Sequence, residues 1–331
     1  MESVIVNVII LLIGLTLLWK CADLLVSGAV GLAEYLSVSP IIIGLTIVSI
    51  GTSAPEIAAS VTASLKGASD IALGNVYGSN IANLALVGGV VAVILPLEIK
   101  PLIIIKREIP IMVAVALLLL PVIFDAELQR FEAVFLLVVF ACLLFGIILM
   151  AKNERRRKPA IAAQTSRELL SEIEKVPHSL KKCILFICLG LAGIVFGADI
   201  SVRSAVRLGE LVGLSQAVIG LTIIALGTSL PELATSLVAA LRQQQDISIG
   251  NLVGSNVFNT LLVTGAAGTI KPFHLNPRLA GTDYWIMVGV SVVFALVVGA
   301  GAKKITRTGG VILLCCYVGY MVYLLVFTAT L

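Results

Sequence analysis

Two stretches of this chain, 43–83 and 219–259, are copies of each other. They read IGLTIVSIGTSAPEIAASVTASLKGASDIALGNVYGSNIAN and IGLTIIALGTSLPELATSLVAALRQQQDISIGNLVGSNVFN, and they align without a gap with 22 of 41 positions identical. Shared apolar composition alone would give about one match in ten, so the stretches are a duplication. The same offset of 176 residues pairs Asp23 with Asp199. The chain is therefore expected to fold as two related halves.

The composition places both halves in a membrane. Of the 331 residues, 59% are hydrophobic and 13% are charged, and the mean hydropathy is +1.10, whereas soluble domains carry about 25% charged residues. A helix needs about 20 apolar residues to cross the hydrocarbon. The sequence predicts an all-α polytopic membrane protein with about ten transmembrane helices, at 3–27, 40–65, 71–97, 109–124, 131–151, 183–206, 216–241, 247–270, 284–302 and 309–329.

The number of predicted spans determines how the two copies are oriented. Five spans separate them, and an odd number reverses the second copy in the bilayer. We therefore expect two inverted five-helix repeats, 1–151 and 183–331, joined by a linker at 152–182. Inverted repeats with helices interrupted at matching positions are typical of secondary transporters, whose site lies near the bilayer midplane.

The distribution of basic residues predicts the topology. With the amino terminus outside, sixteen Lys and Arg residues fall in inner segments and six in outer ones. This asymmetry places both termini outside and the 152–182 linker in the cytoplasm. The expected location is the cell membrane, or inner membrane, with the lipid bilayer as a partner. The basic linker is interpreted as a topology determinant, not as a nucleic-acid site. One chain completes the predicted site, and the oligomeric state is left open.

Each copy carries a glutamate inside a predicted span, directly after a proline. These are Glu56 in GTSAPE and Glu232 in GTSLPE. Side chains four residues apart share a helix face, so the polar residues around each glutamate form stripes. The stripes are Thr52, Glu56 and Ser60; Asn75, Ser79 and Asn83; Thr228, Glu232 and Ser236; and Asn251, Ser255 and Asn259, with Ser53 and Ser229 beside them.

The prolines should interrupt the helices that carry the glutamates. Pro55 and Pro231 have no backbone donor, and a glycine four residues before each one makes unwinding easier. We expect carbonyl oxygens at 49–52 and 225–228 to be freed from helix hydrogen bonds and to line a cavity. Each GNxxGSN segment, with two glycines and two asparagines, is expected to break or bend as well.

A buried glutamate at mid-bilayer needs compensation, because an ionised carboxylate there costs from about 2.5 to over 10 kcal/mol. No Lys or Arg lies within 43–65 or 219–241. A bound hard cation fits, since carboxylate, hydroxyl, amide and carbonyl oxygens are its preferred ligands. The alternative, a pair of protonated glutamates with a packing role, does not explain the duplicated stripes. Asp23 and Asp199 are interpreted as helix-end or ion-pair residues.

The paired motifs, GTSAPE with GNVYGSN and GTSLPE with GNLVGSN, resemble the two alpha-repeats of the calcium:cation antiporter superfamily, in its sodium/calcium exchanger branch of prokaryotic type. The resemblance implies an ion site formed by helices 2, 3, 7 and 8, and sliding of helices 1 and 6. It implies calcium ligation by the carboxylates of Glu56 and Glu232 and the backbone oxygens of Thr52 and Thr228. The implied sodium sites add hydroxyl and carbonyl oxygens of Thr52, Ser53, Ser79, Thr228, Ser229 and Ser255. Asn83 and Asn259 occupy the remaining central positions.

The predicted function is a secondary active antiporter that exchanges sodium for calcium by alternating access, with no cofactor and no enzymatic activity. Two ionised glutamates are neutralised by one calcium ion, two sodium ions or two protons, so a proton/calcium antiporter stays open as the alternative. The hydroxyls favour sodium. If three sodium ions bind, as the resemblance implies, transport is electrogenic. Some relatives carry aspartate where this chain has Asn259, so transport is expected to be potassium-independent.

Two other classes of function fit the sequence less well. A passive calcium channel is expected to carry a ring of carboxylates from several subunits, whereas two inverted copies complete a site within one chain. An intramembrane hydrolase is disfavoured because neither HExxH nor GxGD occurs.

Overall fold

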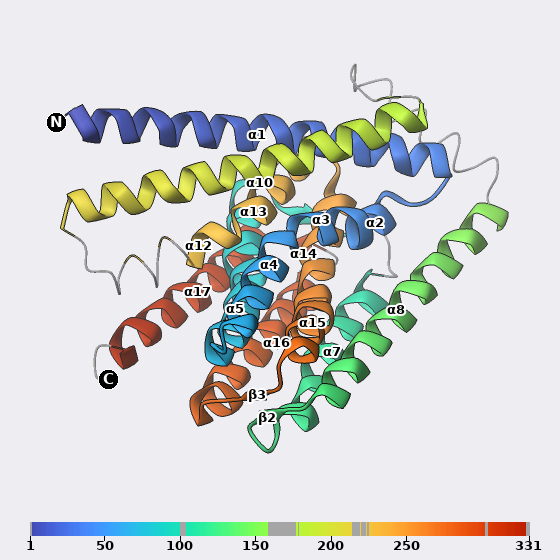
Figure 1. Cartoon of the computed structure of the whole chain (residues 1–331). Helices are drawn as coiled ribbons and strands as arrows, with labels where there is room; N and C mark the ends of the chain where they lie inside the picture. Colours follow the sequence, from blue (N-terminus) through green and yellow to red (C-terminus); the bar gives the residue numbers. More distant parts are fainter. Residues whose placement is uncertain are drawn as a thin grey trace.

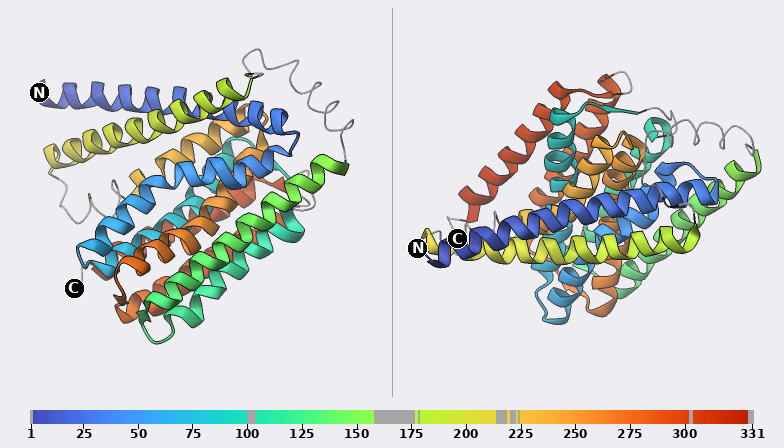
Figure 2. Two further views of the ribbon diagram at one scale, coloured as in Figure 1. Left: turned by 45° about the vertical axis from the view of Figure 1, so that its right-hand side comes forward. Right: turned by 90° about the horizontal axis from the view of Figure 1, so that it is seen from above.

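The structure is a computed structural model that describes residues 2–99, 104–157, 177, 179–213, 219, 223, 225–301 and 304–328. Its two longest helices, α1 (Glu2–Leu36) and α10 (Leu180–Leu211), lie side by side along one edge of the molecule (Figures 1 and 2). Glycines allow their backbones to approach closely: a Cβ on Gly197 would lie 2.9 Å from the backbone nitrogen of Leu18. Both helices extend beyond the predicted spans.

The remaining elements of the first half include three short π-helical segments, labelled η, each continuous with an α-helix. One predicted span is a broken helix, bent by 44° between its α3 and α4 segments. The elements in chain order are α2 (Pro40–Ile43), η1 (Gly44–Val48), α3 (Ser49–Thr52), α4 (Ala54–Leu65), α5 (Ser69–Ile81), η2 (Ala82–Val87), α6 (Gly88–Ile94), η3 (Ile104–Glu108), α7 (Ile109–Ile123) and α8 (Arg130–Arg157).

The second half repeats this order. Shifted by 176 residues, α3 and α4 coincide with α12 and α13, so the duplication is visible in local structure as well as in sequence. The elements are α12 (Ala225–Thr228), α13 (Leu230–Leu241), α14 (Gln245–Phe258), η5 (Asn259–Val263), α15 (Thr264–Ile270), η6 (Leu279–Asp283), α16 (Tyr284–Ala300) and α17 (Arg307–Thr328). Most of the linker (158–176 and 178) and part of the seventh predicted span (216–218, 220–222 and 224) lie outside the described residues.

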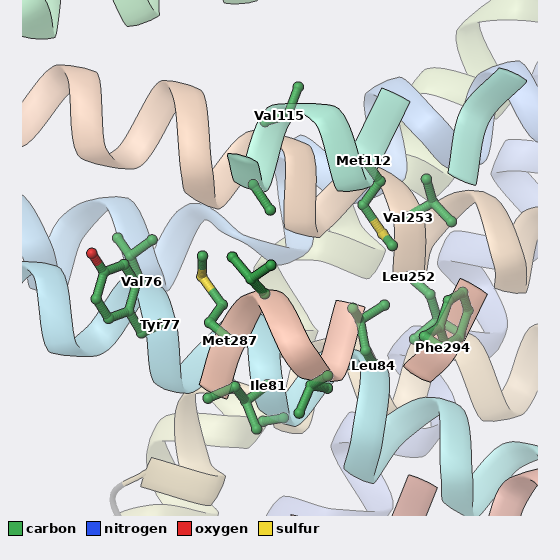
Figure 3. Close-up of a cluster of buried hydrophobic side chains, with 14 of the residues drawn as sticks. Val76, Tyr77, Ile81, Leu84, Met112, Val115, Leu252, Val253, Met287 and Phe294 are labelled. Atoms are coloured by element: carbon green, nitrogen blue, oxygen red, sulfur yellow. The ribbon is translucent and has the colours of Figure 1, made fainter. Parts of the chain in front are cut away.

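The two halves interlock. Two short antiparallel strand pairs each join one half to the other: β1 (Leu97–Glu98) with β4 (Lys304–Ile305), and β2 (Glu127–Leu128) with β3 (Phe273–His274). In the same way α6 packs against α17, and its counterpart α15 packs against α8. The buried core lies between the halves and draws on α5, η2, α7, α14 and α16 (Figure 3). Neither half therefore encloses its core alone.

Six helices among the described residues are long and apolar enough to cross a membrane. They are Val4–Leu36, Ser69–Ile94, Arg130–Asn153, Leu180–Leu211, Leu279–Ala300 and Arg307–Val326, and the bent pair Pro40–Thr52 with Ala54–Leu65 makes seven if it is one span. The expected number of ten is not reached by this criterion. Helix α7 has only 15 residues, and the Asn, Ser and Thr residues between 245 and 270 lower the hydropathy of that segment. The apolar helices support a multi-pass integral membrane protein.

The structure contradicts one predicted detail of the helices and confirms another. Helices α5 and α14 run without a break through both GNxxGSN segments, and the irregularity follows them at η2 and η5. Asn75 and Asn251 donate to serines of a neighbouring helix and Asn80 donates to Thr260, so these side chains do not compete for the hydrogen bonds of their own backbone. Asn256 donates to the Leu252 carbonyl one turn back, within the continuous helix. Asp23 and Asp199 lie inside α1 and α10, not at helix ends, and each forms the expected ion pair, Asp23 with Arg242 and Asp199 with Arg203.

Candidate cation site

Each of the two glutamates lies in the first turn of a half-helix. Helix α4 begins directly after Ser53, whose φ and ψ of −83° and 6° interrupt the preceding helix, and Glu56 follows Pro55. The second copy repeats this at Ser229, with φ and ψ of −90° and 2°, and Glu232. The helix dipole favours negative charge in the first turn. The sequence produces this break because proline fits the first turn of a helix and not its interior.

The breaks free fewer carbonyl oxygens than expected. The Ser53 N–H donates to the Ser49 carbonyl at 3.0 Å, and the Ser229 N–H donates to the Leu226 carbonyl at 3.2 Å. The expectation is therefore wrong for these two carbonyls. The carbonyls of Gly51 and Gly227 cannot accept the usual helix hydrogen bond from the residue four positions later, because that residue is Pro55 or Pro231 and has no N–H.

Nine of the ten predicted ligand residues are buried. Glu56, Glu232 and seven neighbours are each at most 2% exposed, and only Thr228 is half-buried: the seven are Thr52, Ser53, Ser79, Asn83, Ser229, Ser255 and Asn259. Within the described residues, many of their polar atoms have no hydrogen-bond partner: both carboxylate oxygens of Glu56, Oε2 of Glu232, the hydroxyls of Ser79, Ser229 and Ser255, and both carboxamide atoms of Asn83 and Asn259. Buried polar atoms are normally paired, so this oxygen-rich set has the character of a ligand site.

Hydrogen bonds between the two copies bring the parts of this site together. The Ser53 hydroxyl of the first copy donates to Glu232 Oε1 of the second at 3.1 Å. The neighbouring Thr52 hydroxyl donates to Asn251 Oδ1, also at 3.1 Å. The break in the first copy therefore lies directly against the carboxylate of the second.

Four residues outside the predicted ligand set support the site. Asn75 Nδ2 donates to Ser60 Oγ at 2.9 Å, and Asn251 Nδ2 donates to Ser236 Oγ at 3.0 Å. The two bonds are equivalent under the 176-residue shift, and each ties a glutamate helix to the helix that follows it. All four residues lie on the sequence stripes. Sequence spacing does not predict that these residues join helices, because it shows which residues share one helix face but not which face of the neighbouring helix contacts it.

The electrostatics of the site favour a cation. Within the described part of the chain, neither Glu56 nor Glu232 forms an ion pair with Lys, Arg or His. No group of three or more His, Cys, Asp or Glu side chains gathers among the described residues either. Two buried carboxylates supplemented by hydroxyl, amide and carbonyl oxygens fit a hard cation such as Ca²⁺. They do not resemble the His and Cys sets that bind zinc.

Comparison with known proteins agrees with this donor set. The family described as sodium/calcium exchanger protein matches residues 6–149 and 182–326. The chain belongs to the sodium/calcium exchanger family. This is a family of transporters, not of enzymes, and the inverted repeat is consistent with its fold.

Individual proteins match this chain over nearly its whole length. The inner membrane protein YrbG of Escherichia coli strain K12 is 35% identical over 306 residues, covering 92% of each chain. The sodium/calcium exchanger MaX1 of Methanosarcina acetivorans is 32% identical over 346 residues, covering 96% of this chain and 98% of MaX1. A structure of the sodium-calcium exchanger NCX_Mj, soaked with 10 mM Na⁺ and 10 mM Sr²⁺, is 30% identical and superposes with a TM-score of 0.79, over 95% of this chain and 97% of NCX_Mj.

Proposed function

We propose that this chain is a secondary active antiporter that exchanges sodium for calcium through one site, exposed alternately to the two sides of the membrane. The observation that carries the proposal is that Glu56 and Glu232 are both fully buried among oxygen atoms without partners, with the Ser53 hydroxyl before Glu56 bonded to Glu232. Two carboxylates without a basic partner are stable in a bilayer only when cations or protons neutralise them.

Each predicted ligand receives a role in this proposal. Calcium binds the carboxylates of Glu56 and Glu232 and the backbone oxygens of Thr52 and Thr228. Sodium ions use the same carboxylates with oxygens of Thr52, Ser53, Ser79, Thr228, Ser229 and Ser255, while Asn83 and Asn259 line the centre. Because both ions depend on the same glutamates, each excludes the other, and this exclusion couples their movements.

The charges of the site determine the energetics of exchange. One calcium ion or two sodium ions neutralise two glutamates, so a third sodium ion would carry one net positive charge across per cycle. Such transport responds to voltage by about 2.3 kcal/mol per charge per 100 mV. Asn259, neutral at its position, makes the proposed exchange independent of potassium.

The proposed topology has ten crossings in two inverted five-helix repeats, 1–151 and 183–331. Both termini lie outside, and the basic 152–182 linker lies in the cytoplasm. Support comes from the excess of basic residues on one side, from the strand pairs that relate the halves and from the similarity to the inner membrane protein YrbG.

Calcium uptake into sealed vesicles tests the proposal. Vesicles loaded with sodium and diluted into sodium-free medium containing labelled calcium are expected to accumulate calcium, even when an ionophore collapses the proton gradient and choline replaces potassium. A proton/calcium antiporter would instead lose uptake with the ionophore. Uptake that needs neither gradient would indicate a channel and would overturn the proposal.

A further inference from the structure

The two copies are packed differently against the long helices α1 and α10. Helix α13 is covered by α1, and its residues Ala234, Thr235 and Val238 are buried. The equivalent residues of α4 are Ala58, Ala59 and Thr62, and all three are exposed. The sequence duplication alone would make these faces alike, so the difference belongs to the conformation of the molecule.

An open cavity lies between α10 and the start of α4. It has a volume of about 490 Å³ and is lined by residues of α10 and by Gly51 and Ala54, which flank the break before Glu56. Asp199 of α10 lies at this cavity. Helix α1 is therefore packed closely against α13, whereas the equivalent pair, α10 and α4, is separated by open space.

The open and covered sides also differ in their ion pairs. At the end of α13, Arg242 pairs with Asp23 of α1 and its guanidinium donates to Ser27 Oγ of the same helix. Under the 176-residue shift, the residue equivalent to Arg242 is Lys66, at the end of α4, and the residue equivalent to Asp23 is Asp199. Asp199 instead pairs with Arg203, one turn along its own helix, at 2.8 Å. Lys66 is exposed and forms no ion pair with any described residue.

A second positive charge lies at the end of α4. The ammonium group of Lys271 lies 2.8 Å from the position that a Cβ on Gly67 would occupy. Lys66 and Lys271 thus both lie at the end of α4, and their positive charges would attract an arriving carboxylate.

We propose that Asp23–Arg242 and Asp199–Lys66 are alternating locks of the transport cycle, and this proposal rests on the alternating access proposed above. In the conformation described here, the first lock is closed and the second is open. In the opposite conformation, α10 covers α4, Asp199 shifts from Arg203 to Lys66, and the Asp23–Arg242 pair separates. Helices α1 and α10 move together because their glycine-lined contact, at Gly190 and Gly197, holds their backbones in register.

Each lock shifts the balance between the two conformations by a modest factor. The Asp23 and Arg242 side chains are 35% and 22% exposed, so water screens the pair and its contribution resembles that of a surface ion pair. A contact made in only one conformation changes the ratio of the two by its own free energy. Removing one lock is therefore expected to change that ratio roughly two- to fivefold.

Cross-linking in membrane vesicles tests the second lock directly. Cysteines in place of Lys66 and Asp199 are treated with a short bis-maleimide, and the cross-linked peptide is quantified by mass spectrometry. The pair should cross-link faster than a control pair at Lys66 and Arg203, and adding Arg242→Gln should raise the rate roughly two- to fivefold. No preference over the control, or a rate unchanged by Arg242→Gln, overturns the proposal.

The cross-link does not depend on which ions are exchanged. Absence of the cross-link in vesicles that retain sodium-driven calcium uptake therefore overturns the locks and leaves the proposed function intact.

A second measurement uses single variants. Arg242→Gln removes the lock of the described conformation, and with the proposed topology it should raise the external calcium concentration for half-maximal transport. Lys66→Gln removes the lock of the opposite conformation and should lower that concentration. The exchange Asp23→Arg with Arg242→Asp should restore the original value, and shifts of equal sign in the two single variants contradict the locks.

Discussion

Glu56 and Glu232 are fully buried, and neither forms an ion pair with a described residue. Their unusual position, inside apolar helices and without a basic neighbour, identifies Glu56 and Glu232 directly, and the four-residue spacing identifies the polar atoms around them. The bond from Ser53 to Glu232 could not be derived in the same way. It joins residues 179 positions apart, and spacing along one helix carries no information about the partner helix.

At the residue scale, Glu56→Gln and Glu232→Gln are expected to lower calcium transport by at least a hundredfold while the protein stays folded. The amide keeps the shape of the side chain but removes the charge that a divalent cation requires. Glu34→Gln, in α1 and outside the polar cluster, is the matched control and should transport normally. Calcium uptake together with thermal unfolding in detergent measures both effects. Normal uptake by either site variant would contradict the assignment.

At the level of elements, proline and glycine determined where the helices break, and the structure confirms the interruptions next to Pro55 and Pro231. The GNxxGSN segments were mispredicted because glycine and asparagine were interpreted through their backbone preferences. In the structure, Asn75 and Asn251 serve in contacts with the neighbouring helix. The π-helical segments η2 and η5 contain neither proline nor glycine, so no comparable signal marks them in the sequence.

The break itself has a testable role. Pro55→Ala supplies the missing N–H, which lets the Gly51 carbonyl regain its helix bond and favours a straighter helix. Calcium transport is expected to fall severalfold, whereas the unfolding temperature stays the same or rises. Pro121→Ala is the matched control, because Pro121 lies inside α7, a different helix from those that carry the glutamates. Equal effects of the two substitutions on transport would show that the break near Glu56 has no special role.

At the scale of the whole molecule, the duplication predicted two related halves, but not how they interlock. The strand pairs and the exchanged contacts of α6 with α17 and of α15 with α8 join one half to the other. The unequal packing of α4 and α13 was not predictable either. Two duplicated sequences imply similar environments, and the conformation of the whole chain distinguishes them.

The contact between the halves makes a further prediction. A Cβ on Gly250 would lie 2.9 Å from the Ile41 carbonyl oxygen, because α14 and α2 touch through their backbones. Gly250→Ala is expected to destabilise the protein by about 1–3 kcal/mol. Gly289→Ala, in α16 with no described atom within 4 Å of the new methyl group, should instead be neutral or stabilising by up to about 1 kcal/mol. Thermal unfolding in detergent compares the two variants, and equal effects would contradict the close packing.

Equilibrium binding of labelled calcium to the purified protein, titrated with sodium, tests the central claim most directly. If Glu56 and Glu232 form one shared site, sodium displaces all bound calcium, and the Glu56→Gln and Glu232→Gln variants lose the binding that sodium can displace. Calcium that stays bound at saturating sodium, or that binds normally to either variant, would show that the two ions do not share the site between these glutamates.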